Sequence, residues 1–190
     1  MKNIIPVHAT MKGSLLAGRG LNPRIPISTL WGFEHIRAGK LIDKWECLNV
    51  ITTEGFNHML DVQFGAVAKI ATWYLTIFED DYTPLITNTY AVPGYTESTA
   101  YDEANRIEFI DVPAAARVMT NTASKGTFTI SATKIMYGAS LVGGTNAATK
   151  DDTTAGVANI LFCSSSFGGG KSFVDDDVLL VDCTITLADS

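Results

Sequence analysis

Short runs of β-branched and aromatic residues, separated by turn-forming residues, dominate the second half of the chain and limit what it can fold into. The runs are RIEFI, GTFTISA, KIMYGASLV, ANILFC and VLLVDCTITL. Gly, Asn and Asp between them favour turns. With TWYLTIF at residues 72–78 and a hairpin over residues 31–51 that turns at Ala38-Gly39, they predict an all-β fold. We expect an antiparallel β-sandwich or jelly-roll-like body of at least six strands.

One segment, TTEGFNHMLDVQF, has a helical period instead. Its apolar side chains recur at i, i+3, i+4 and i+8 and so share one helix face: Phe56, Met59, Leu60 and Phe64. Thr52 or Thr53 can cap such a helix, and Gly65 can end it. We therefore expect one short helix near residues 53–64.

Residues 1–30 differ in kind from the rest of the chain. They mix prolines and glycines with strongly apolar residues, which disfavours both a long helix and a central strand. An extended apolar segment gains stability only by lying on another surface. We expect an extended N-terminal docking arm at residues 1–30 and a body at residues 31–190, with a floppy terminus as the alternative.

The charge distribution supports an arm and a body that prefer different surroundings. Residues 1–33 carry four basic residues and no acidic one, so their net charge is +4, and the remaining residues carry −10 of the total of −6. The basic residues Lys12, Arg19 and Arg24 are candidates for electrostatic contacts with a partner. The candidates for apolar anchoring are Ile4, Ile5, Leu15, Leu16, Ile25 and Ile27.

The stretch SSSFGGGKSF at residues 164–173 resembles half of a phosphate-binding loop. A full loop needs G-x-x-x-x-G-K-[ST] between a parallel strand and a helix. Here Ser165 stands where the first glycine belongs, and only five residues separate Ser172 from the next apolar run at Val178. A crossover to a parallel strand needs a dozen residues or more. The sequence therefore excludes a nucleotide site and predicts that the glycine run is a turn between two strands.

No other pattern indicates catalysis, a metal or a cofactor. The three cysteines share no ligand spacing and are expected to be buried thiols, and the three histidines are scattered: Cys47, Cys163, Cys183, His8, His35 and His58. The acidic run Asp175–Asp177 lacks the alternating spacing of a calcium loop. The negative net charge argues against nucleic acid as the main partner, and no apolar run approaches the ~20 residues of a membrane span.

Aromatic side chains leave a binding function open. Trp73, Tyr74, Tyr82, Tyr90, Tyr95 and Tyr101 could form a sugar-stacking surface. One of Trp73 and Tyr74 is expected in the core because they are neighbours on a strand. For the loop tyrosines, packing onto the sheet is the commoner alternative.

Four segments in order carry a resemblance to a known family. They are LNVITTEGFNHML, ATWYLTIFEDDYTPL, YTESTAYDEANRIEF and GTFTISATKIMYGASLV. Over roughly residues 33–187 the chain resembles the capsid decoration, or head cement, proteins of tailed bacteriophages. The resemblance implies architectural roles, not catalytic ones, for Thr53, Gly55, Asn57, Trp73, Tyr74, Tyr101 and Arg106, with Arg106 in a position suited to a buried ion pair.

What the resemblance implies about function is structural. It implies a virion protein on the outer capsid surface with the major capsid protein as partner. The lack of a membrane span and of a continuous signal-peptide core indicates synthesis in the host cytoplasm, and no motif indicates a cofactor. We expect a homodimer or homotrimer whose symmetry matches a local symmetry axis of the shell. The alternative is a virion fibre or tail-associated module that binds a host-surface glycan through its loop aromatics.

Overall fold

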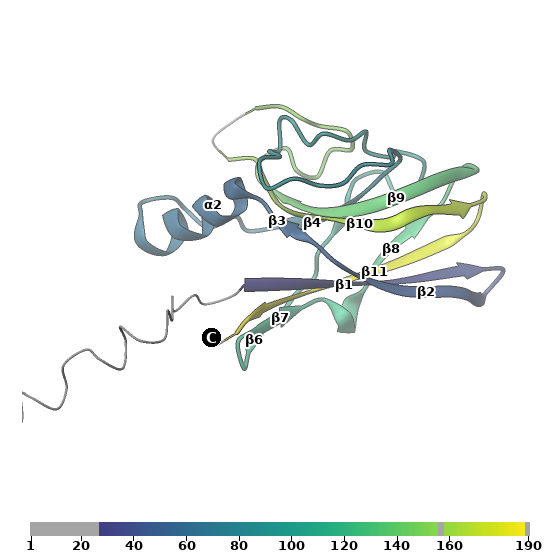
Figure 1. Cartoon of the computed structure of the whole chain (residues 1–190), viewed down its shortest axis with the longest axis horizontal. Helices are drawn as coiled ribbons and strands as arrows, with labels where there is room; N and C mark the ends of the chain where they lie inside the picture. The colour runs from purple at the N-terminus through teal and green to yellow at the C-terminus, as the bar shows by residue number, and fades with distance from the viewer. Residues whose placement is uncertain (1–26, 156–157, 189–190) are drawn as a thin grey trace, which may run out of the picture.

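Two antiparallel β-sheets pack face to face in the computed structural model, which describes residues 27–155 and 158–188 (Figure 1). The first sheet has the order β2-β1-β11-β7-β6, and β8 also pairs with β11. Its strands are β1 (Ile27–Arg37), β2 (Lys40–Leu48), β6 (Val112–Ala115), β7 (Val118–Thr120), β8 (Gly126–Thr129) and β11 (Val178–Leu187). The second sheet has the order β3-β10-β9-β4-β5. Its strands are β3 (Val50–Ile51), β4 (Trp73–Phe78), β5 (Ile107–Glu108), β9 (Lys134–Gly143) and β10 (Ile160–Phe173).

The prediction of an all-β body with one short helix is confirmed. Helix α2 (Thr53–Phe64) has the predicted bounds, and a 3-10 turn, η2 (Thr122–Ser124), precedes β8. The hairpin β1–β2 turns at Ala38 and Gly39, whose φ angles of 49° and 73° suit the two-residue turns that match strand twist.

Alternating side chains of the long strands fill the space between the sheets. In β1, Trp31, Phe33 and His35 are buried, whereas Leu30 lies on the outer face. Large, fully buried side chains come from both sheets and include Trp31, Phe33, Leu75, Ile77, Phe128, Met136, Phe173 and Val181. Removal of this shared apolar surface from water is the main force that holds the two sheets together.

The glycine run is not a turn, contrary to the sequence prediction. Gly168–Gly170 lie inside β10, which pairs with β9 on both sides of them: Ser166 is opposite Gly138, and Lys171 is opposite Met136. The run is part of a large bulge in which residues 167–170 stand opposite Tyr137 alone, and Gly168 and Gly169 take φ angles of 71° and 152° that other residues rarely adopt. The chain reverses later, at residues 174–177.

The boundary of the predicted arm also moves. β1 begins at Ile27, which pairs with Leu187 and packs partly against the core. Residues 27–30 therefore belong to the sheet, and Ile27 is a half-buried sheet residue instead of an arm anchor. The other predicted contact residues lie outside the described residues: Ile4, Ile5, Lys12, Leu15, Leu16, Arg19, Arg24 and Ile25.

The carboxylate of Asp177 holds the corner where the chain passes from β10 in one sheet to β11 in the other. It accepts hydrogen bonds from Arg37 Nε at 2.7 Å, Arg37 Nη2 at 2.6 Å, His35 Nε2 at 2.8 Å and the Val174 backbone N–H at 2.8 Å. Asp177 is 1% exposed, so its charge is stabilised by these donors and hardly by water. The Arg37 guanidinium, with the other donors, holds the pKa of this carboxyl well below its ordinary value.

Replacing Asp177 by Asn should remove a stabilisation that depends on pH. The pKa of Asp177 is lower in the folded state than in the unfolded state. The carboxylate therefore stabilises the folded state fully at pH values above the unfolded-state pKa of about 4, and this stabilisation fades as the pH falls toward the folded-state pKa. We expect D177N to lower the free energy of unfolding by about 2 kcal/mol at pH 7, and the deficit to shrink by pH 3. Urea unfolding at both pH values measures this. The exposed neighbour variant D175N should change little, and a D177N deficit that is equal at both pH values would contradict the account.

Candidate functional site

Helix α2 is the element around which the surface hollows gather, and the side chains of Thr52 and Glu54 fix it on β10. The Thr52 hydroxyl accepts a hydrogen bond from the Gly55 N–H at 2.9 Å and donates to the Leu161 carbonyl at 2.5 Å. Glu54 Oε2 accepts from the backbone N–H groups of Leu161 at 2.6 Å and Tyr90 at 2.8 Å. Of the two predicted candidates, Thr52 is thus the N-cap, and Gly65 ends the helix as expected.

Only the first half of α2 is covered by the sandwich. Gly55 is buried, and Phe56 and Met59 pack against the core. Leu60 and Phe64, which share the predicted apolar face with Phe56 and Met59, are 57% and 82% exposed. The reason is that α2 extends beyond the end of the sheets, so no strand lies beneath its last turns (Figure 1).

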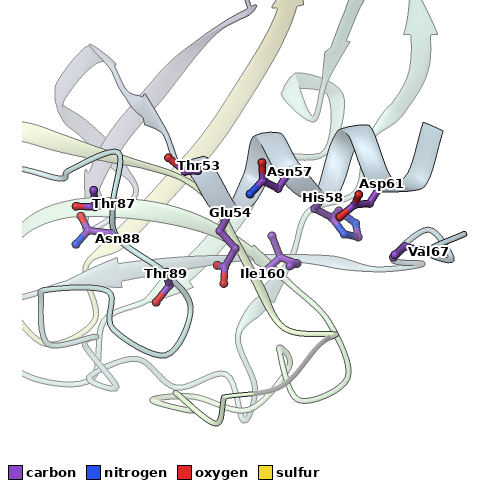
Figure 2. A pocket seen from close by; sticks show the side chains of 10 residues that line it. All are labelled: Thr53, Glu54, Asn57, His58, Asp61, Val67, Thr87, Asn88, Thr89 and Ile160. Carbon is purple, nitrogen blue, oxygen red and sulfur yellow. The ribbon is translucent and has the colours of Figure 1, made fainter. Parts of the chain in front are cut away.

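A hollow of about 470 Å³, with mostly polar residues around it, lies between α2 and the loop at residues 87–89. Figure 2 shows Glu54 pointing from α2 toward Ile160 and Thr89, with Asn57, His58 and Asp61 further along the same helix. The His58 ring meets the Trp73 ring edge-on, with centroids 5.8 Å apart, and burial lowers the pKa of His58. The imidazole is therefore neutral at pH 7. Within residues 27–155 and 158–188, His58 makes no hydrogen bond to a hydroxyl or thiol that it could activate.

An apolar cavity of about 320 Å³ lies at the same end of the sandwich, on the inner side of α2. Both sheets, the helix and the β6–β7 hairpin contribute to its wall. The lining residues are Met59, Trp73, Phe109, Ala114, Arg117, Val118, Met119, Leu141, Phe162, Ile185 and Leu187. Exposed apolar side chains on neighbouring segments include Val67 (44%), Ile110 (55%) and Val112 (45%). The core is therefore open at this end.

Arg106 lies at the centre of a second group of polar residues, and the hydrogen bonds of this group stabilise the fold. Its guanidinium donates to Glu97 at 2.9 and 2.5 Å, to the Tyr90 hydroxyl at 2.8 Å and to the Asp152 carbonyl at 2.9 Å. Arg106 is 5% exposed, which bears out the buried ion pair expected at this position. Burial alone would lower the pKa of Arg106, but the hydrogen bonds and charge of Glu97 outweigh it and raise the pKa. The network ties the loops around residues 90, 97 and 152 to the sheet.

Of the six aromatic residues in the predicted stacking surface, Tyr90 and Tyr101 are buried, and the other four are half-buried: Trp73, Tyr74, Tyr82 and Tyr95. Tyr90 and Tyr101 are 4% and 2% exposed. Tyr95 stacks on Phe78 with centroids 4.2 Å apart and donates to Ser140 Oγ at 2.6 Å. Burial raises the pKa values of Tyr90 and Tyr95 to about 12. These rings offer no open face to a sugar.

The acidic and cysteine residues that the sequence offered as candidates for metal binding are also part of the fold. Asp177, the last acid of the run considered for calcium, is occupied by Arg37 and His35. Cys163 and Cys183 are buried as expected, whereas Cys47 is half-buried. No group of three His, Cys, Asp or Glu among the described residues could hold a metal ion. No helix in the described part of the chain is long and apolar enough to cross a membrane.

Comparisons with protein-family models, curated proteins and solved structures found no match to this chain.

The sequence pattern does not indicate the open apolar end, because it does not predict the β6–β7 hairpin that forms one wall of the cavity. Its strands are only four and three residues long, and β6 contains Pro113 and two alanines, which carry little strand signal.

Replacing Gly55 by Ala should disturb the packing of α2 against β10, between the two hollows. A Cβ atom there would lie 2.5 Å from the Phe162 carbonyl oxygen and 3.0 Å from its Cα. Alanine favours a helix by about 1 kcal/mol over glycine, but the backbone of a central strand cannot move aside. We expect G55A to lower the free energy of unfolding by about 1–3 kcal/mol in urea titrations. The control Q63A, on the exposed part of the same helix, should stay within about 0.5 kcal/mol of the parent. A G55A protein as stable as the parent would refute the close contact.

Proposed function

We propose that this chain is a structural, non-enzymatic virion protein that decorates the outer surface of a phage capsid and bridges neighbouring major capsid protein subunits. The observation that carries the proposal is the open apolar end of the sandwich, which lies where residues 1–26 join the body. β1 starts there, beside the C-terminal end of β11, the β6–β7 hairpin and α2 (Figure 1). The resemblance of residues 33–187 to head cement proteins supports the same function.

The main polar clusters of the body stabilise the fold, which fits a protein that acts by binding. Asp177, Arg106 and Glu54 each hold parts of the fold together through several hydrogen bonds. A cement protein needs contact area, and stable interfaces bury about 1,200–2,000 Å² in total. Exposed apolar side chains such as Leu60, Phe64 and Ile110 offer such area at the open end. We therefore infer that the open end faces the shell and the Asp177 corner faces outward.

The charge asymmetry suits this orientation. Residues 1–26 contain four basic residues and no acid, whereas the rest of the chain has a net charge of −10. A basic arm can lie on an acidic shell while an acidic body keeps the outer face solvated. Ordering an arm costs about 1–2 kcal/mol per residue in backbone entropy, so the repeated sites of a shell, which allow avid binding, are the suitable setting.

A homodimer or homotrimer forms part of the proposal. β2 and β6 are the edge strands of the larger sheet, and all four residues of β6 are exposed. Unpaired strand edges are ready surfaces for another chain. We do not propose the glycan-binding alternative, because Tyr90 and Tyr101, two of its expected stacking residues, are buried.

Sedimentation with capsids tests the proposal. Capsids would be assembled from the major capsid protein encoded in the same genome. The full-length chain should co-sediment at a saturating, symmetry-matched ratio, and a chain lacking residues 1–26 should bind at least tenfold more weakly.

Charge variants refine the same experiment. K12E/R19E/R24E should weaken binding strongly, whereas K40E, at the distant β1–β2 turn, should have little effect. Absence of co-sedimentation by the full-length chain would overturn the proposed function.

A further inference from the structure

The apolar cavity at the open end is a built feature of the core. Phe109, Leu141 and Phe162 form its deep wall and are at most 6% exposed. Met59 from α2, Met119 from β7 and Ile185 from β11 complete the sides. Its volume of about 320 Å³ is at the lower end of the range for ligand sites. Such a surface is unfavourable in water, so an apolar group that fills it would be retained.

The chain itself brings an apolar segment to this cavity. Leu187 lines the cavity and pairs directly with Ile27, the first described residue. Residues 1–26 therefore join the body at the cavity rim. This segment contains the adjacent leucines Leu15 and Leu16 and carries only positive charge, opposite to the body. Leu16 can reach about 35 Å from Ile27 at full extension, and Gly18 and Gly20 between them allow the chain to reverse.

We propose that the apolar cavity is the docking site of Leu15 and Leu16 of the same chain while the protein is free in solution. A tether of about ten residues gives the leucines a millimolar effective concentration at the cavity, above that of a second copy under ordinary conditions. The other apolar pair, Ile4 and Ile5, would close a longer loop at a greater entropic cost. Docking keeps the leucines and the open core out of water until a partner surface displaces them.

Methionine-methyl NMR of the full-length protein tests this docking without any capsid. Met59 and Met119 line the cavity, and Met136, which is fully buried in the core, is the internal reference. We expect L15D/L16D to shift the Met59 and Met119 methyl resonances and to leave Met136 in place. A9D/T10D, which adds the same charge to the same segment, should leave all three unchanged. The difference should persist on tenfold dilution.

Three results would overturn the proposal. The first is identical Met59 and Met119 resonances in L15D/L16D and the parent protein. The second is an equal shift in A9D/T10D, which would assign the effect to charge alone. The third is a shift that disappears on dilution, which would place the leucines of a second copy in the cavity. Unchanged melting temperatures show that the variants keep the body folded. Because no capsid is present, these results are independent of the sedimentation experiment.

Discussion

The carboxylate of Asp177 fixes the link between the two sheets, which their shared apolar surface holds together. β10 lies inside the smaller sheet and β11 inside the larger one, and the short link between them sets how the sheets face each other. By binding His35 and Arg37 of β1, Asp177 fastens this link to a third strand. The polar corner therefore closes one end of the sandwich, where the Phe173 ring packs against His35 with centroids 4.1 Å apart.

The opposite end of the same strands has the opposite character. Phe162, early in β10, and Ile185, late in β11, line an open apolar cavity with Met59 of α2. The core is thus closed by charge and hydrogen bonds at one end and open at the other, and the open end is where the basic segment of residues 1–26 joins the body. This difference between the two ends is the physical basis of the proposed orientation on a shell, because covering apolar surface with a partner lowers the free energy most.

Local patterns predicted the elements, and long-range contacts decided what the patterns could not. Alternation in β1 and β11 and the Thr52 cap were readable, because they depend on neighbours in the sequence. The role of Asp177 was not, since its partners lie about 140 residues away in an unrelated segment. Gly168–Gly170 have the composition of a turn, but pairing with β9 continues on both sides and makes them a bulge. The exposure of Phe64 depends on where the sheets end, which helical periodicity does not encode.

Electron cryomicroscopy of capsids incubated with the protein tests the central claim most directly. The account predicts additional density on the outer surface that fits the β-sandwich, with α2 and the β6–β7 hairpin against the shell and the Asp177 corner pointing outward. Capsids without added density, or bodies attached through the Asp177 corner, would contradict it.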